Sequence, residues 1–363
     1  MRLATVFDPE SHEPCAVFEL PSGHRVPLRE LFRAETDSLA VDDSLSEDRL
    51  RDELPIYFTD ISKTVQFLDD VIDAARQWAR ERADEVDRRG GSQADELTGG
   101  APSRVDAMPF LPPVPIVRAF REFDAFEPHA RKWRQAYGLT LPTSWNDAPA
   151  FAFGPTTSLV GHGSPVHAPA GCDELDFGLQ LAAIVGRGGR DIAAKDAWKH
   201  VAGFTIVNAL VARDFEKREL TSCLGRSRSR GFATAVGPYL VSLDALRDRI
   251  DADGRLHLNA KALVNSQEVN RADAATMSFA WPRLIEEASR DAELCPGDLI
   301  SSGTVTGGCL LDKKLGPWLK PGDVVDLEVE RLGTLRTPII VRPDDERQAT
   351  YETLVAGTAD DNR

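Results

Sequence analysis

The sequence predicts an α+β fold that is rich in strands, with a smaller domain at the N-terminus. The chain has 363 residues, of which 42% are hydrophobic, and this is enough for one sizeable core and a smaller one. After residue 108, many short apolar runs of strand length are separated by Gly and Pro. Between the two halves, residues 90–102 begin and end near Gly pairs and have the composition of a flexible linker.

The first half is predicted to begin as a small β structure and to continue as a helix. Alternating apolar and polar residues predict short strands at Ala4–Phe7, Ala16–Leu20 and Arg25–Pro27. Over Ser62–Arg89 the apolar residues follow helical spacing, and charged residues occupy the other face. We interpret this helix as packing on its own domain rather than as binding a partner. Residues 1–107 are therefore predicted to form an N-terminal β-plus-helix domain with its linker.

The second half is predicted to be a larger, β-rich domain. Helical spacing at Phe126–Tyr137 and Met277–Ala288 interrupts the strands. We assign residues 108–345 to this domain and residues 346–363 to a C-terminal tail. The predicted strands are Leu179–Val185, Phe204–Val211, Tyr239–Val241, Leu299–Ser301, Val324–Val329 and Pro338–Val341.

Charge and cysteine usage argue against several classes of protein. With 43 basic and 58 acidic residues the formal net charge is −15, so binding to nucleic acid or to an anionic membrane is not expected. We find no run of about 18 apolar residues that would span a membrane, and the first ten residues do not resemble a signal peptide. The five cysteines are scattered and form no metal-binding spacing. These features predict a cytoplasmic protein with reduced thiols.

Several blocks of the second half carry a family resemblance. In order and spacing they resemble the fumarylacetoacetate hydrolase family over roughly residues 108–342, and most closely its longer members, which have an extra N-terminal domain. The resemblance implies a mixed β-roll, a homodimer, and an active site within the roll. The blocks are GHGSPVHAPAGCDELDFGLQLAAIVGRGGRDI from Gly161, AWKHVAGFTIVNALVARDFEKREL from Ala197, GFATAVGPYLV from Gly231, PGDLISSGTVTGGCLLD from Pro296 and LKPGDVVDLEVERLGTLR from Leu319.

The resemblance also implies a chemistry. Family enzymes typically cleave a carbon–carbon bond in a β-diketo acid, or decarboxylate or isomerise related keto acids. A divalent Mg, Mn or Ca ion chelates the substrate oxygens through several oxygen ligands and stabilises the enolate that forms. A dyad of histidine and an acid activates water.

The positions where the family carries metal ligands hold other residues in this chain. The family motif Asp-x-Glu-x-Glu corresponds to Asp176–Gln180, so Gly178 and Gln180 replace its two ligating glutamates. Ala209 replaces the ligating aspartate of the next strand, and Glu122 corresponds to a further ligand of longer members. One carboxylate and one amide hold a divalent cation poorly, because little offsets the loss of its hydration shell. We therefore predict no metal cofactor, although the family implies Mg or Mn.

A metal site built from other residues is the alternative. Carboxylates are the side chains that hard divalent ions prefer, and acids follow or precede the altered positions. Their ordinary interpretation is as solvated turn residues or as partners of Arg213. The candidates are Asp173, Glu174, Asp176 and Asp214.

The residues for acid and base chemistry are better preserved. By the resemblance, His129 is the catalytic histidine and Asp312 stands for the acid that orients it, while Glu122 assists them. Aspartate also orients an imidazole and stabilises its charged form. Arg230 replaces a lysine that binds a substrate oxygen, and Thr304 keeps a hydroxyl donor there. The guanidinium is a planar fork that suits a carboxylate. The expected substrate-binding residues are therefore Arg230, Thr304 and Gln180.

Two functions are open at this point. The first is an enzyme that acts on a keto acid or a β-diketone-type substrate by metal-independent acid and base chemistry. The reaction would be C–C hydrolysis, decarboxylation, isomerisation, dehydration or cyclisation. The second is a catalytically inactive family member that acts as a binding protein. The missing metal ligands favour the second function, and the pair of His129 and Asp312 favours the first.

Overall fold

The computed structural model describes residues 1–9, 12–20, 23–28, 107–221, 225–313 and 317–342. Its largest element is a ten-stranded mixed sheet. The strands of this sheet are β1 (Arg2–Asp8), β2 (Glu13–Glu19), β3 (Arg25–Pro27), β4 (Phe120–Phe123), β5 (Phe151–Phe153), β6 (Leu159–Val160), β8 (Leu179–Val185), β9 (Val201–Ala209), β11 (Thr234–Ser242) and β14 (Leu299–Ser301). They lie in the order β3-β2-β1-β11-β9-β8-β14-β4-β5, and β6 pairs with β11.

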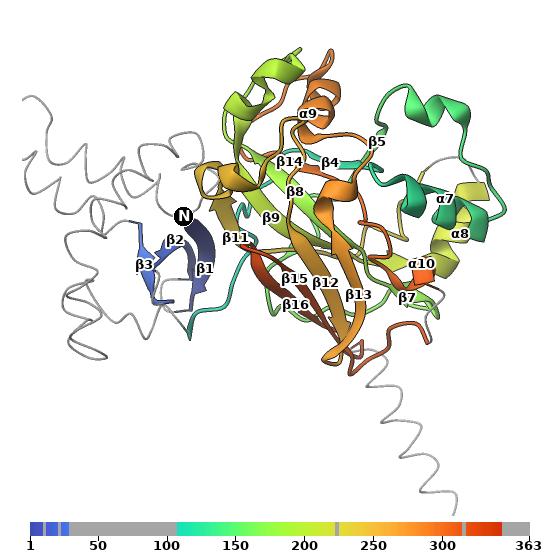
Figure 1. Cartoon of the computed structure of the whole chain (residues 1–363). Helices are drawn as coiled ribbons and strands as arrows, with labels where there is room; N and C mark the ends of the chain where they lie inside the picture. Colours follow the sequence, from blue (N-terminus) through green and yellow to red (C-terminus); the bar gives the residue numbers. More distant parts are fainter. Residues whose placement is uncertain (10–11, 21–22, 29–106, 222–224, 314–316, 343–363) are drawn as a thin grey trace, which may run out of the picture.

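The N-terminal strands extend this sheet. β1 pairs antiparallel with β11, with Arg2 opposite Val241 and Leu3 opposite Leu240, and β2 and β3 continue outward from it (Figure 1). The three strands predicted near the N-terminus are confirmed at these positions. The predicted helix at Ser62–Arg89 and the linker at residues 90–102 lie outside the described residues, so the domain boundary at residue 107 stays a prediction.

A second, four-stranded sheet closes the core. Its order is β13-β12-β15-β16, and β16 lies against β11 and β9 of the large sheet. Buried side chains from both sheets and from one helix form a single hydrophobic cluster, in which Phe204 meets Trp281 edge to face at 4.7 Å. The elements are β12 (Asn259–Val264), β13 (Gln267–Asp273), β15 (Val324–Val329), β16 (Gly333–Pro338) and the helix α9 (Trp281–Ser289).

Central strands of the large sheet are buried on both faces. Every residue of β8 and β9 is buried, because one face packs on the four-stranded sheet and the other on the N-terminal strands. Strands covered on both sides have nearly continuous apolar sequences, which explains why β8 was predictable from its sequence. The last predicted strand, Pro338–Val341, is wrong. β16 instead starts directly after the turn at Arg331 (φ 66°) and ends at Pro338.

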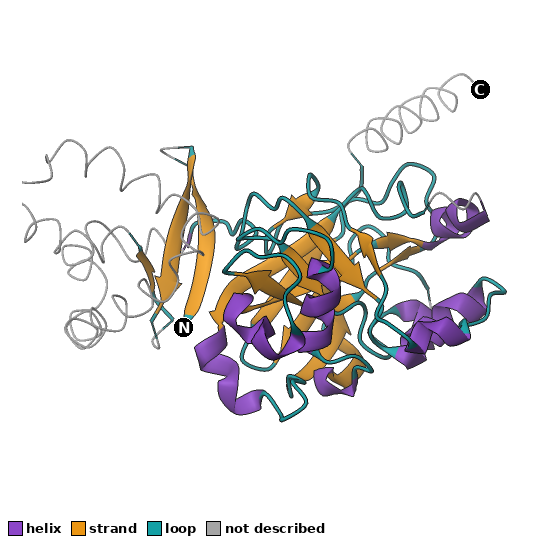
Figure 2. Ribbon diagram, turned by 90° about the horizontal axis from the view of Figure 1, so that it is seen from above, coloured by secondary structure: helices purple, strands orange, loops and turns teal. Residues whose placement is uncertain are grey.

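The remaining helices gather at one end of the molecule, opposite the N-terminal strands (Figures 1 and 2). The helix predicted at Phe126–Tyr137 is confirmed as α7, which has Pro128 in its first turn, a position that proline favours. No helix of the described residues is apolar and long enough to cross a bilayer. These elements are α7 (Glu127–Ala136), α8 (Arg213–Thr221) and α10 (Leu310–Lys313), beside the strand pair β7 (Leu175–Asp176) and β10 (Val211–Ala212). Short 3-10 helices lie at Thr143–Asn146, Ala194–His200, Leu243–Arg249 and Ala274–Thr276.

Candidate active site

A cavity of about 180 Å³ lies where these helices meet the edge of the large sheet. Its size suits a small metabolite rather than a drug-sized ligand. Four of the six predicted site residues line it, and the other two, Gln180 and Asp312, stand directly behind the lining residues. The polar side chains of the wall are Glu122, Asp124, His129, Trp133, Arg134, Arg213, Arg226, Arg230 and Thr304.

His129 and Asp312 form a buried pair. Nδ1 of His129 lies 2.9 Å from Oδ1 of Asp312, and the N–H of Gly307 donates to Oδ2 at 2.8 Å. Burial alone would raise the pKa of Asp312, but its hydrogen bond to His129 and the histidine's charge hold the pKa below its ordinary value. A carboxylate opposite Nδ1 assigns the proton to that nitrogen. Because His129 lines the cavity, its Nε2 is the nitrogen left to accept a proton.

The second charged centre joins Glu122 to Arg230. Nη2 of Arg230 and Nε2 of Gln180 each lie 2.5 Å from Oε1 of Glu122. Burial would raise the pKa of Glu122, but the charge of Arg230 and both hydrogen bonds lower it below the ordinary value. Glu122 is therefore an ionised carboxylate whose counterion is a guanidinium. Gln180 faces this carboxylate and does not line the cavity.

The residues at the family's metal-ligand positions do not fit a divalent ion. A Cβ atom at Gly178 would lie 2.8 Å from Thr304 Oγ1 and 3.1 Å from the carbonyl oxygen of Ala209, so a longer side chain has no room there. Ala209 is fully buried in an apolar cluster. The side-chain amide of Gln180 donates a hydrogen bond from its N–H to Glu122. One amide oxygen and one carboxylate already paired with arginine fall short of the several oxygen ligands that these ions require.

Two of the four acids proposed for a relocated metal site, Asp176 and Asp214, have other partners. Asp176 accepts from Arg213 Nε at 3.0 Å and from the N–H of Phe177 and of Leu310, each at 2.8 Å. Asp214 accepts from the N–H of Phe215 at 3.0 Å and from the N–H of Asp173 at 3.1 Å. Across the described ranges, one group of three possible ligands gathers, and it consists of His129, Asp312 and Cys309. Burial raises the pKa of the Cys309 thiol well above its ordinary value, which disfavours the thiolate that a metal would need.

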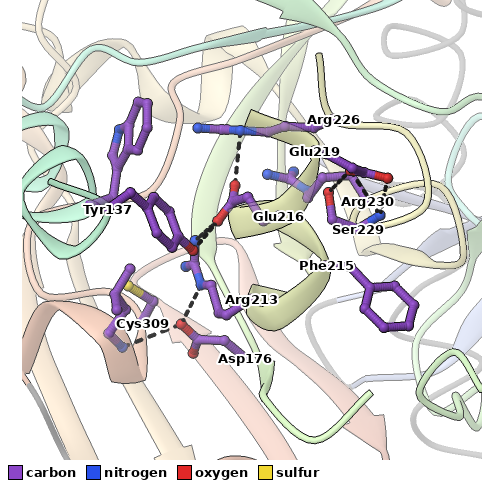
Figure 3. Close-up of polar contacts among 12 residues, drawn as sticks. Tyr137, Asp176, Arg213, Phe215, Glu216, Glu219, Arg226, Ser229, Arg230 and Cys309 are labelled. Carbon is purple, nitrogen blue, oxygen red and sulfur yellow. Dashed lines mark hydrogen bonds and ion pairs between the residues drawn. The ribbon is translucent and has the colours of Figure 1, made fainter. Parts of the chain in front are cut away.

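A buried ionic network (Figure 3) adjoins the cavity through Arg213 and Arg226, which line it. Glu216 accepts from Arg213 Nη1 at 2.8 Å and from the Tyr137 hydroxyl at 2.6 Å, and it pairs with Arg226 Nε at 2.8 Å. Burial would raise the pKa of Glu216, but the charges of Arg226 and Arg213 outweigh it and lower the pKa to about 2. The sequence reasoning did not assign Glu216 or Arg226 to the site.

The loop before β11 carries two arginines into the cavity. The carboxylate of Glu219 accepts hydrogen bonds from three successive backbone N–H groups, residues 227–229, and from the hydroxyls of Ser227 and Ser229. This single side chain fixes the loop on α8 (Figure 3). The loop therefore holds Arg226 and Arg230 in place on either side of the fixed segment.

Comparison with known proteins covers the same part of the chain that holds the cavity. The family profile described as "Fumarylacetoacetate (FAA) hydrolase C-terminal" matches residues 118–340. The chain belongs to the fumarylacetoacetate hydrolase family. This confirms the resemblance predicted from the sequence blocks. The β-rich α+β fold is confirmed by a fumarylacetoacetate hydrolase of Exiguobacterium antarcticum, which matches 94% of this chain and 100% of that chain with a TM-score of 0.62 and 19% identity.

Relatives within the fumarylacetoacetate hydrolase family have several activities in their names. Oxaloacetate tautomerase YisK of Bacillus subtilis is 32% identical over 192 residues, which are 52% of this chain and 60% of that protein. The mitochondrial oxaloacetate tautomerase fahd2 of Xenopus laevis is 30% identical over 51% of this chain and 56% of that protein. A 2,4-didehydro-3-deoxy-L-rhamnonate hydrolase of a Sphingomonas species is 32% identical over 55% of this chain and 67% of that protein. The chain thus matches little more than half of the length of the first two.

Proposed function

We propose that this chain catalyses proton transfer on a small keto acid, with His129 as general base and without a metal ion. The observation that carries the proposal is the buried pair of His129 and Asp312, in which His129 lines a cavity that also presents Arg230 and Thr304. An imidazole that is oriented by a carboxylate is suited to move a proton to and from a substrate.

The proposed step is keto–enol tautomerisation. Nε2 of His129 takes the proton from the carbon next to the ketone, and the electrons of the broken C–H bond move to the carbonyl oxygen. Asp312 stabilises the imidazolium that results. Arg230 and Thr304 donate to the developing enolate oxygen, and the imidazolium then returns the proton to that oxygen. The substrate's carbon loses one proton and its oxygen gains one, so no co-reactant is required.

In this proposal, the guanidinium of Arg230 stabilises the enolate in place of the divalent metal ion that the family uses. Its guanidinium is anchored on Glu122, its side chain is only 7% exposed, and its Nε is buried without a hydrogen-bond partner among the described residues. A fixed cation in a site with little water stabilises developing negative charge strongly. Enolate formation is shared by C–C hydrolysis and decarboxylation, so the same residues support these reactions on a more activated substrate.

Two relatives named as oxaloacetate tautomerases support the choice of tautomerisation. An inactive binding protein is the second candidate function, favoured by the replacement of the ligand positions with Gly178, Gln180 and Ala209. The homodimer and the cytoplasmic location stay predictions.

The experiment compares wild type with His129→Ala after treatment with chelator. Conversion of the enol of oxaloacetate and of other keto acids is followed by the loss of enol absorbance. We expect a metal-independent rate that His129→Ala lowers by about 10²–10⁴-fold. His257→Ala, which removes an exposed histidine paired with Asp251, is the matched control and should keep the wild-type rate. A rate unchanged in His129→Ala, or no conversion of any keto acid tested, would contradict the proposal.

A further inference from the structure

We propose that Arg226 is a second anion-binding position in the cavity, which selects a keto acid that carries two carboxylates. The inference rests on the proposed function, because it names the class of substrate that this function would act on. Arg230 and Thr304 bind the reacting end of the substrate, and Arg226 binds the carboxylate at the far end. No feature of the sequence assigned Arg226 to the site.

The guanidinium of Arg226 is held rigidly from two directions. Its Nε lies 2.8 Å from Oε1 of Glu216, a fully buried carboxylate. Its central carbon lies 4.6 Å from the centroid of the Trp133 ring, which is itself buried. The contact with the aromatic ring and the ion pair with Glu216 restrict the guanidinium before any ligand arrives. Little conformational entropy is then lost when the substrate binds.

Arg226 keeps two nitrogen atoms available. The Nη1 and Nη2 atoms donate no hydrogen bond to any described residue, and the side chain is 28% exposed while it lines the cavity. By contrast, Arg213 uses Nε on Asp176 and Nη1 on Glu216 and is 5% exposed. The free pair of Nη atoms forms the planar fork that binds a carboxylate with two parallel hydrogen bonds.

The negative charge of Glu216, which pairs with Arg226, is shared with other groups. Glu216 accepts hydrogen bonds from Arg213 and from the hydroxyl of Tyr137, and it also forms an ion pair with Arg226. A carboxylate shared among these three groups compensates the charge of each arginine only in part. An incoming anion therefore finds a guanidinium whose charge is not cancelled by a dedicated partner, in a wall that is largely screened from water.

The two arginines are coupled by their loop. Glu219 fixes the backbone of residues 227–229, so Arg226 and Arg230 enter the same cavity of about 180 Å³ from one rigid support. A cavity of this size holds about six water molecules at ~30 Å³ each. In this proposal a short-chain keto dicarboxylate occupies the cavity, with one anionic group directed to each arginine.

The test measures discrimination between one and two carboxylates in wild type and Arg226→Gln. Oxaloacetate is compared with 2-oxobutanoate as substrates, and succinate with butyrate as non-reacting ligands in calorimetric titrations. We expect Arg226→Gln to raise the KM for oxaloacetate and the Kd for succinate by about 10–100-fold. This range corresponds to the loss of a hydrogen bond to a charged group. The KM for 2-oxobutanoate and the Kd for butyrate should change by less than about twofold in the same variant.

Two further variants separate the subsite from general damage. Arg228→Gln removes the neighbouring guanidinium, which stacks on Phe215 outside the cavity wall, and should leave both ligand classes unchanged. Arg226→Lys keeps the charge without the fork and should restore part of the preference for two carboxylates. Equal losses for one and two carboxylates in Arg226→Gln would overturn the inference. A succinate preference that Arg226→Gln abolishes, in a protein that converts no keto acid, would support the subsite and reject the proposed function.

Discussion

Arg230 places its Nη2 atom 2.5 Å from Oε1 of Glu122, on the carboxylate that corresponds to a metal ligand in longer members of the family. In the proposed function, this guanidinium supplies the positive charge that the family resemblance assigns to a metal ion. The arrangement also explains why Gln180 is tolerated, because its amide N–H completes the coordination of the same oxygen atom. Gly178 leaves space for Thr304, because a Cβ atom at this position would lie 2.8 Å from the threonine hydroxyl.

Removing one partner of the Glu122–Arg230 pair should destabilise the protein more than replacing both partners by neutral side chains. Arg230→Met leaves a buried carboxylate without its cation, so we expect a loss of about 3 kcal/mol in the free energy of unfolding. The double variant with Glu122→Gln removes both charges and should lose less than Arg230→Met alone. Urea denaturation of the wild type, both single variants and the double variant measures the coupling between the two side chains. Additive losses would contradict this account of the site.

Metal removal should leave the protein unchanged. A resident divalent ion at about 100 times its Kd would stabilise the fold by roughly 2.7 kcal/mol. The replacement of the ligands at Gly178, Gln180 and Ala209 predicts no such effect. We expect the same Tm and the same keto-acid turnover after excess EDTA and after added Mg²⁺ or Mn²⁺. A Tm that falls with EDTA and recovers with one of these ions would show that a metal binds.

Much of the fold was readable from local sequence. β8 and β14 have the predicted bounds, because a continuous apolar run of strand length indicates a buried strand. The pair of His129 and Asp312 was reached through the family resemblance, since no local pattern joins residues 183 positions apart.

The network on α8 shows what local sequence does not reveal. The segment Arg213–Thr221 is dense in charged residues, and such a run normally forms a solvated helix face. Here Arg213 and Glu216 are buried instead. Their partners, Tyr137 and Arg226, come from α7 and from the loop before β11. Only the tertiary fold brings these groups together and offsets the cost of burying their charges.

Stability should fall on acidification partly through Glu216. Its pKa is about 2 in the folded protein against an ordinary value of 4.5, so its stabilising contribution is complete above pH 4.5 and is lost as the pH falls towards 2. We expect wild type to lose about 2 kcal/mol more than Glu216→Gln between pH 7 and pH 3. Urea denaturation at both pH values measures this difference. Glu127→Gln, at a half-exposed side chain of α7, is the control and should lose as much as wild type.

Asp312 should act on catalysis through the tautomer of His129. Asp312→Asn keeps the size of the side chain, but its amide is able to donate to Nδ1 and so favours the tautomer with the proton on Nε2. That tautomer cannot accept a proton from the substrate, so we expect kcat to fall by about 10²–10⁴-fold with little change in KM. Asp312→Glu restores a carboxylate and should recover part of the rate. Steady-state tautomerisation of a keto acid measures both variants. Asp312→Asn with wild-type kcat would show that His129 does not depend on this carboxylate and would remove the basis for assigning its Nε2 as the base.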